Sequence, residues 1–262
     1  MNRLNLIIPL ILLFCGINGI AQDFTKYEKG SFIKGKDSIS YRVLFPENFD
    51  PAKQYPILFF LHGRGESGND NQKQLTHGGK LFLKDELRRQ FPAIVVFPQC
   101  RADSYWSNVN ISTEANGRRV FNFQEKGKPT KAMQALLGMV ANFMDKPYIN
   151  KKQVYVGGLS MGGMGTYELL RRKPRLFAAA FAICGGDHVA NVQRYQKIPL
   201  WIFHGEKDDV VPVSCSTLIA DQLKVLGHPA KLTLYPEANH NSWDRAFAEP
   251  DLLPWLFSNR KK

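Results

Sequence analysis

Ser160 is flanked by glycines in a way that suits a nucleophilic serine. Residues 158–162 read Gly-Leu-Ser-Met-Gly, so a glycine stands two positions away on each side of it. A hydroxyl that must stand clear of a sheet needs a sharp turn with a strained backbone, and side chains at those two positions would collide in it. The spacing therefore predicts Ser160 as a candidate nucleophile.

The residues around this pentapeptide favour a strand before it and a helix after it. Val154, Tyr155 and Val156 form a β-branched and aromatic run, and a helical pattern continues through Tyr167 and Leu170. Gly-x-Ser-x-Gly carries functional meaning in this strand–turn–helix context. A helix that begins just after the serine also points its free N–H groups toward the position of an oxyanion.

Two later segments supply the partners that a serine nucleophile requires. A serine becomes reactive when a histidine accepts its proton and an acid orients that histidine. The apolar run 200–203 is followed by Asp208 and Asp209, and the run 231–235 is followed by His240. The order serine, acid, histidine is therefore present, each at the end of a predicted strand, and either aspartate is a candidate for the acid.

Buried strands alternate with helices along most of the chain. The predicted strands, besides the one before Ser160, are 55–61, 93–97, 176–183, 200–203 and 231–235. The predicted helices, besides the one after Ser160, are 72–90, 131–144, 214–226 and 246–258, the last interrupted by Pro250 and Pro254. A hairpin of 23–34 with 38–45 opens the chain, and 101–128 form a long polar loop, which is usually functional or disordered. This order predicts an α/β fold with a mostly parallel central sheet, helices on both faces and ligand sites at the carboxyl ends of the strands.

Residues 1–21 have the pattern of a cleaved secretory signal peptide. Arg3 is their only charge, a long apolar run follows it, and Gly19 and Ala21 place small residues where a signal peptidase acts. We therefore expect an exported protein, secreted or periplasmic, whose single catalytic domain spans 22–262.

Two other uses of this N-terminal segment are disfavoured. A lipoprotein signal would use Cys15, but the bulky Phe14 precedes that cysteine. The uninterrupted apolar run is also short for a retained membrane span. We expect no stable membrane anchor.

The charge balance is basic. Removing Arg3 from the 35 Lys and Arg leaves 34 basic against 23 acidic side chains, a formal charge of +11. This favours either a generally basic surface or an affinity for an anionic polysaccharide or membrane face. The export signal and the lack of a recognisable binding motif argue against nucleic acid as a partner.

The cysteines do not indicate a disulfide framework or a metal centre. Cys100, Cys184 and Cys215 remain after the signal peptide, an odd and widely spread set that leaves a single bridge open. No Cys or His pair has the spacing of metal ligands. We expect neither a metal nor a cofactor.

Five motifs in order make the chain resemble a known superfamily. They are Leu61-His62-Gly63-Arg64-Gly65, Pro98-Gln99-Cys100, Gly158-Leu159-Ser160-Met161-Gly162-Gly163, His204-Gly205-Glu206-Lys207-Asp208 with Val211-Pro212, and His240-Asn241-Ser242-Trp243. The chain resembles the α/β-hydrolases over nearly its whole predicted mature length. It is most similar to the secreted carboxylesterase and phospholipase-like group that includes feruloyl and acetyl-xylan esterases, some of whose members are labelled predicted peptidases.

The resemblance implies a role for each site residue. Ser160 would be the nucleophile and His240 the general base. Asp208 would be the acid, because the family pattern places it three residues after the glycine of His-Gly and three before the valine of Val-Pro, which disfavours Asp209. The backbone N–H groups of Met161 and Arg64 would form the oxyanion hole. His62 and His204 would hold loops by hydrogen bonds.

Two features bear on the substrate. Cap domains of this superfamily commonly lie between the strands that end at residue 183 and begin at residue 200, and this connection is short, so we expect no cap domain and an open cleft. Tyr105 and Trp106 are candidates for a platform under a sugar or an aromatic acyl group, and the alternative for Trp106 is an anchor of its loop in the core.

These observations predict a secreted serine esterase that cleaves short-chain or aromatic carboxylic esters, either small molecules or acyl groups on polysaccharide. A serine peptidase of the prolyl-oligopeptidase-like type is one alternative. A non-catalytic binding protein on the same scaffold is another, and the complete set of Ser160, Asp208 and His240 argues against it. A dienelactone-type hydrolase is disfavoured because it uses a cysteine nucleophile.

Overall fold

The computed structural model describes residues 24–262. The predicted signal peptide, 1–21, lies outside this range. No helix in the described part of the chain has both the length and the apolar character needed to cross a membrane.

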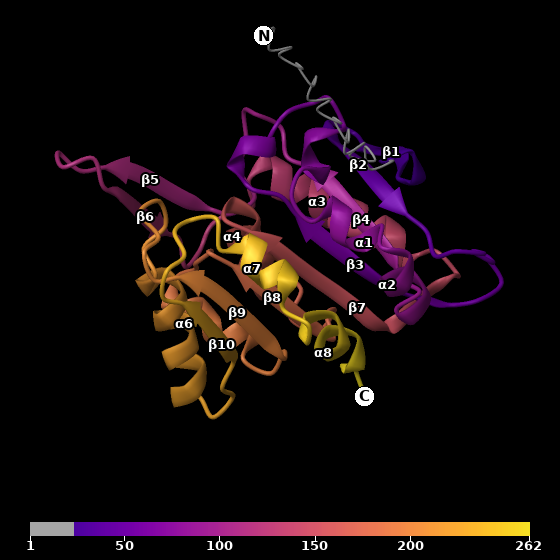
Figure 1. Cartoon of the computed structure of the whole chain (residues 1–262). Helices are drawn as coiled ribbons and strands as arrows, with labels where there is room; N and C mark the ends of the chain where they lie inside the picture. The colour runs from indigo at the N-terminus through magenta and orange to yellow at the C-terminus, as the bar shows by residue number, and fades with distance from the viewer. Residues whose placement is uncertain (1–23) are drawn as a thin grey trace, which may run out of the picture.

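Eight strands form one mostly parallel sheet (Figure 1), in the order β1-β2-β4-β3-β7-β8-β9-β10. They are β1 Glu28–Lys34, β2 Asp37–Leu44, β3 Tyr55–Leu61, β4 Ile94–Gln99, β7 Ile149–Leu159, β8 Ala179–Ile183, β9 Leu200–Gly205 and β10 Lys231–Tyr235. The pairs β1–β2 and β2–β4 are antiparallel, and every other pair is parallel. The α/β prediction is therefore confirmed, with the predicted hairpin as the antiparallel edge.

Helices cover both faces of this sheet. The core cluster on one face includes residues of α3 Lys131–Met144, α4 Met161–Arg172, α5 Val192–Tyr195 and α6 Ser214–Val225. The cluster on the other face includes residues of α1 Gly79–Phe82, α7 Trp243–Ala248 and α8 Leu252–Ser258, with α2 Asp85–Gln90 packed beside it. Four 3₁₀ turns complete the described elements: η1 Phe24–Lys26, η2 Arg64–Glu66, η3 Lys73–Leu75 and η4 Val189–Asn191.

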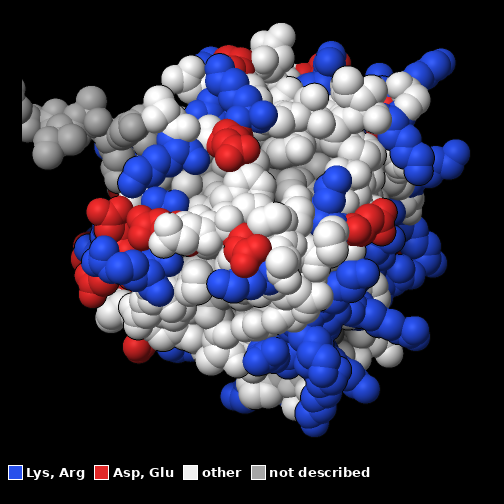
Figure 2. Space-filling view, turned by 90° about the vertical axis from the view of Figure 1, so that its right-hand side faces the viewer, with Lys and Arg blue, Asp and Glu red and all other residues white. Residues whose placement is uncertain are grey.

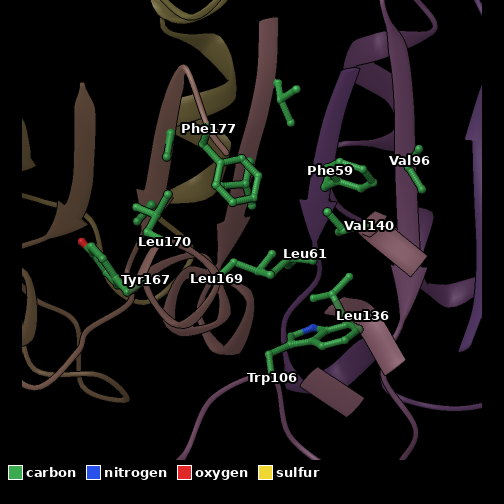
Figure 3. Packing of buried hydrophobic residues seen from close by; sticks show 14 of the residues in the cluster. Phe59, Leu61, Val96, Trp106, Leu136, Val140, Tyr167, Leu169, Leu170 and Phe177 are labelled. Carbon is green, nitrogen blue, oxygen red and sulfur yellow. The ribbon is translucent and has the colours of Figure 1, made fainter. Parts of the chain in front are cut away.

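Strand β3 shows how the central strands bury both faces. Its side chains alternate, so that Phe59 and Leu61 join the cluster under α3 and α4, while Leu58 and Phe60 join the opposite cluster. Figure 3 shows Phe59 and Leu61 among side chains of the first cluster. A parallel strand covered on both faces reads as a continuous apolar run, which is why β3 was predictable.

Three segments differ from the sequence prediction. The predicted helix 246–258 forms α7 and α8 on the two sides of Pro250, while Pro254 lies within α8 and does not interrupt it. The predicted helix 72–90 is broken into η3, α1 and α2, because Gly78 adopts a positive φ of 86° between the first two. The predicted loop 101–128 contains a hairpin, β5 Val109–Thr113 with β6 Arg119–Phe123, which projects from the body in Figure 1. Its turn has Gly117 at φ 83°, and the Asn116 side chain accepts the Arg118 N–H. Asn116-Gly117 is a turn signal in the sequence, but it stands between two strands whose residues are mostly exposed.

The connection from β8 to β9 contains only η4 and α5 within the described chain. This short connection agrees with the predicted lack of a cap. The parallel strands β3, β7, β8, β9 and β10 end at one edge of the sheet, which we call the carboxyl edge, and they start at the amino edge.

Candidate active site

Ser160 occupies a strained turn between β7 and α4. Its φ of 52° and ψ of −119° are rare for a residue with a side chain. A Cβ at Gly158 would strike the Gly162 backbone, and a Cβ at Gly162 would strike the carbonyl of Leu61. The two glycines are therefore required by the close approach of backbone segments, as the sequence predicted.

The side chains of Ser160, His240 and Asp208 lie in one hydrogen-bonded line. The Ser160 Oγ lies 2.9 Å from His240 Nε2, and His240 Nδ1 lies 2.8 Å from Asp208 Oδ2. Since the carboxylate can only accept from Nδ1–H, the Nε2 atom of the neutral ring is left to accept the serine proton. The structure thus brings together three residues that come from three different strand ends.

Asp208 is held more firmly than its neighbour Asp209. Its side chain is fully buried, and Oδ1 accepts the N–H groups of Val210 and Val211 at 2.9 and 2.8 Å. Burial by itself would raise the pKa of Asp208, but hydrogen bonds from His204, His240 and the backbone lower it below its usual range. The carboxylate is therefore ionised where it faces His240.

Asp209 points elsewhere. This residue is exposed, and its backbone N–H donates to Asn239 Oδ1 at 3.0 Å. The same Asn239 oxygen accepts the His240 N–H at 2.6 Å. Of the two aspartates that the spacing left open, the structure places Asp208 on the histidine and Asp209 away from it.

His204 contacts the same carboxylate oxygen as His240. Its Nε2 lies 2.9 Å from the Val211 carbonyl and 3.2 Å from Asp208 Oδ2, and its Nδ1 lies 2.7 Å from Ser216 Oγ. Both neighbours of Nε2 are acceptors, so Nε2 carries the proton. The expectation that His204 holds a loop omitted this contact with Asp208. Only the His-Gly pair at the strand end was available as a signal.

The two N–H groups expected to form an oxyanion hole flank Ser160. Met161 is the first residue of α4, where no earlier turn offers a carbonyl, and the Arg64 N–H opens the 3₁₀ turn η2. Neither N–H has a backbone acceptor among the described residues. Gly63 brings this turn close to the nucleophile, since a Cβ there would lie 3.7 Å from the Ser160 Cβ.

The Arg64 side chain ties two loops together. Its guanidinium donates to the carbonyls of Ser104 and Ala102 at 2.8 and 2.7 Å, and it lies 5.9 Å from the centre of the Tyr105 ring. These bonds join the loop after β3 to the loop before β5.

Tyr105 and Trp106 have different environments. Trp106 has no exposed surface and packs its ring edge-on against His62, 5.5 Å between centres, so it presents no face to a substrate. Its placement corresponds to the core anchor, not to the platform (Figure 3). Tyr105 is half-buried, its hydroxyl lies 3.7 Å from Met164 Sδ, and burial raises its pKa to about 12.

The Cys184 thiol is buried beside Asp208 and His240. Its Sγ, an Asp208 oxygen and a His240 nitrogen lie within 4.8 Å of one another, a set that includes metal-ligand types. Burial raises the pKa of the Cys184 thiol far above its usual value, and a protonated thiol is a poor metal ligand. The arrangement therefore fits proton transfer better than metal binding. All three described cysteines are free.

A second carboxylate lies on the next loop. Asp187, after β8, accepts hydrogen bonds from Asn191 Nδ2 and the His188 N–H, both at 2.8 Å, and from the Tyr195 hydroxyl at 3.1 Å. Withdrawal from water raises the pKa of Asp187 to about 7 despite these donors. The two loops thus carry acids whose pKa values shift in opposite directions.

An open groove of about 540 Å³ is lined by Asp208 but by neither Ser160 nor His240. It lies between the β5–β6 turn, with Arg118 and Arg119, and the loop that carries Asp208. Ser160 itself is partly exposed. The partial exposure of Ser160 at the carboxyl edge agrees with the open cleft expected without a cap.

A family model described as phospholipase/carboxylesterase matches residues 49–250, most of the chain. The chain belongs to that family. Its membership of the α/β-hydrolases, predicted from five motifs, is thereby confirmed.

Known proteins similar to this family member include esterases. A bifunctional acetylxylan esterase/xylanase of Neocallimastix patriciarum is 30% identical over 71% of this chain and 23% of that protein. A probable feruloyl esterase C of Aspergillus oryzae is 25% identical over 70% of this chain and 59% of that protein. The solved structure of a thermostable esterase superposes with a TM-score of 0.80 and 31% identity, over 90% of this chain and 64% of that one. Probable dipeptidyl-aminopeptidases also match, at 23% identity. This chain thus spans less than two thirds of these curated relatives.

Proposed function

We propose that this protein is an exported serine carboxylesterase, with Ser160 as nucleophile. His240 acts first as general base and then as general acid, and the Asp208 carboxylate orients His240. The observation that carries the proposal is the line of two hydrogen bonds, 2.9 and 2.8 Å, that joins these side chains beside two unpartnered backbone N–H groups. The esterase relatives support it.

In the proposed acylation, the Ser160 Oγ attacks the ester carbonyl carbon while His240 Nε2 takes the hydroxyl proton. The negative charge that develops on the carbonyl oxygen accepts hydrogen bonds from the N–H groups of Met161 and Arg64. Asp208 stabilises the imidazolium. When the tetrahedral intermediate collapses, the C–O bond to the alcohol breaks, and His240 gives its proton to the departing alkoxide.

Deacylation repeats these steps with water. His240 removes a proton from the water that attacks the acyl carbon, and the same N–H groups hold the oxyanion. Collapse of this second intermediate breaks the bond to Ser160, whose oxygen recovers a proton from His240. The carboxylic acid leaves, and no metal or cofactor is required by this sequence of steps.

The open cleft favours substrates whose ester projects from a bulky or polymeric alcohol. We propose short-chain or aromatic acyl groups, either on small molecules or on polysaccharide, because the groove beside Asp208 is open and polar at its rim. Tyr105, whose ring lies under the Arg64 guanidinium, is the remaining candidate from the predicted platform.

The test compares the chain from Gln22 onward with Ser160→Ala, on p-nitrophenyl acetate, methyl ferulate and a peptide p-nitroanilide. We expect ester cleavage that is lost in Ser160→Ala by at least about 10⁴-fold, with an unchanged melting temperature and no cleavage of the anilide. The ratio of acetate to ferulate turnover reports the acyl preference.

The peptidase matches make a serine peptidase the second candidate. It predicts that the anilide is cleaved faster than either ester by the same Ser160-dependent route. Substantial ester cleavage by Ser160→Ala would contradict both candidates.

A further inference from the structure

The amino edge of the sheet carries a cluster of basic side chains. Figure 2 looks onto the side of the molecule where the parallel strands begin, and Lys and Arg gather on its lower part. We define the basic cluster as the six residues Lys151, Lys152, Lys173, Arg175, Arg260 and Lys261.

Three separate segments meet in the basic cluster. The Lys261 backbone N–H donates to the Lys152 carbonyl at 2.9 Å, and the Lys261 ammonium donates to the Arg175 carbonyl at 3.2 Å. Lys173 and Arg175 belong to one turn, which the Leu176 N–H closes on the Lys173 carbonyl. Backbone geometry therefore holds these positive charges together.

None of the six charges is neutralised within the described chain. No ion pair there joins them to an Asp or Glu, whereas other exposed lysines, such as Lys53 and Lys73, have acidic partners. Partial burial lowers the pKa of Lys261. Like charges held close together repel, so a polyanion bound here would relieve an unfavourable interaction.

An apolar groove of about 570 Å³ adjoins the basic cluster. Phe91 and Phe257 stack in its wall, 5.1 Å between ring centres, and Pro56, Pro92 and Pro254 add flat apolar surface. Gln153, next to Lys152, also lines the groove and donates to the Phe257 carbonyl at 3.4 Å. The groove is within the size range of ligand sites.

We propose that the basic cluster and this groove form a second, non-catalytic site that binds an anionic polysaccharide. The cations pair with carboxylate or sulfate groups along the polymer, and sugar rings lie against the prolines and the Phe91–Phe257 stack. A lipid bilayer fits less well, because the exposed large hydrophobic residues Ile33, Ile111, Leu218, Val225 and Leu232 all lie outside the cluster.

This second site lies far enough from Ser160 that a bound polymer would not cover the proposed catalytic residues. Lys152 precedes Ser160 by eight residues along β7, or about 26 Å of extended strand. A polymer bound at the amino edge would hold the protein while the carboxyl edge faces other chains or other ester groups. This proposal adds to the proposed function and does not depend on it.

The test measures binding to immobilised polygalacturonate, dextran sulfate and neutral dextran, with Ser160→Ala as the background so that no turnover interferes. We expect binding to the two polyanions that weakens with added salt and no binding to dextran. The triple variant Lys151→Glu, Lys152→Glu, Lys173→Glu should bind at least about tenfold more weakly. The ratio between the two polyanions distinguishes carboxylate from sulfate recognition.

The matched control is Lys34→Glu, Lys36→Glu, Lys224→Glu, three exposed lysines outside the cluster that form no ion pair. Both triples change the net charge equally, so equal loss of binding would overturn the site and leave only general charge attraction. Preference for anionic vesicles over both polyanions would overturn the choice of partner. When Ser160 is retained, the two triple variants should hydrolyse esters at the same rate as each other. This comparison holds whether or not the proposed esterase function is correct.

Discussion

The loops after β8 and β9 each withdraw one aspartate from water, and the two carboxyl groups respond in opposite ways. The pKa of Asp187 rises to about 7, while the pKa of Asp208 falls below its usual range. Both accept at least three hydrogen bonds, so the number of donors does not explain the difference.

The kind of donor explains it. Asp187 receives hydrogen bonds from an amide, a backbone N–H and a phenol, and the lowering effect of the nearby Arg171 cation on its pKa is opposed by the Glu168 carboxylate. Asp208 receives two backbone N–H groups and two imidazoles, one of which becomes a cation during the proposed reaction. Two imidazole donors on Oδ2 keep the Asp208 carboxylate ionised, although desolvation alone would favour its protonated form.

The largest expected effect comes from removing the charge of Asp208. Asp208→Asn keeps the size of the side chain but can no longer accept from His240 Nδ1–H in the same geometry, so the ring loses its required tautomer. We expect kcat/KM for p-nitrophenyl acetate to fall roughly 10³- to 10⁴-fold. A fall of less than tenfold in a folded variant would move the catalytic acid to another residue.

His204→Gln should have an intermediate effect. It removes one of the two imidazoles on Asp208 Oδ2, and a hydrogen bond to a charged group is worth about 1.5–3 kcal/mol, or about 10- to 100-fold in rate if it acts only through Asp208. The diagnostic result is non-additivity: in the Asp208→Asn background, His204→Gln should cost little more. Full additivity in kcat/KM would mean that His204 acts through the fold alone.

Asp187→Asn should change the pH dependence of stability more than it changes the rate of ester cleavage. Between about pH 4 and 7 the Asp187 carboxyl is ionised in the unfolded chain but still protonated in the folded protein. Its contribution to the free energy of unfolding therefore falls as pH rises through this range. Asparagine removes this titration. We expect the loss of melting temperature from pH 5 to pH 8 to shrink by about 5 °C, with ester turnover within about twofold of the original. An unchanged difference would show that Asp187 titrates as it does in the unfolded chain.

Asp209→Asn should have the smallest effect. Its side chain is exposed, and the bond to Asn239 uses the backbone N–H, which the substitution keeps. We expect kcat/KM to change by less than about twofold. A larger fall than in Asp208→Asn would reverse the comparison between the neighbouring aspartates.

The sequence was most informative where one chemical requirement restricts the residue type. Only glycine fits at positions 158 and 162, because backbone carbonyl groups occupy the space of a Cβ. The apolar run of β3 follows from burial on both faces. These constraints are local, so the strained turn at Ser160 and the parallel sheet were predictable from spacing and composition.

Contacts between distant segments were not predictable in this way. Nothing near His204 in the sequence indicates that its ring would reach Asp208 Oδ2 as well as Ser216, because this depends on how the loop after β9 folds back. Trp106 looked equally suitable as platform or anchor, since an aromatic ring suits both and only packing against His62 separates them. The β5–β6 hairpin was missed because its two strands are only five residues long and none of their residues is buried, so their short alternation of apolar and polar residues stood out little in a polar segment.

The guanidinium of Arg64 has a consequence for how the site would respond to thermal motion. It fastens the loop of the proposed oxyanion donor, the Arg64 N–H, to the loop that carries Tyr105, through the carbonyls of Ala102 and Ser104. Together with the bond from the Gly68 N–H to the Cys100 carbonyl at 2.9 Å, these contacts constrain the two surface loops to move as one body. A ligand that settles against Tyr105 would steady the Arg64 N–H at the same time, so that binding at the rim and alignment of the donor become a single event.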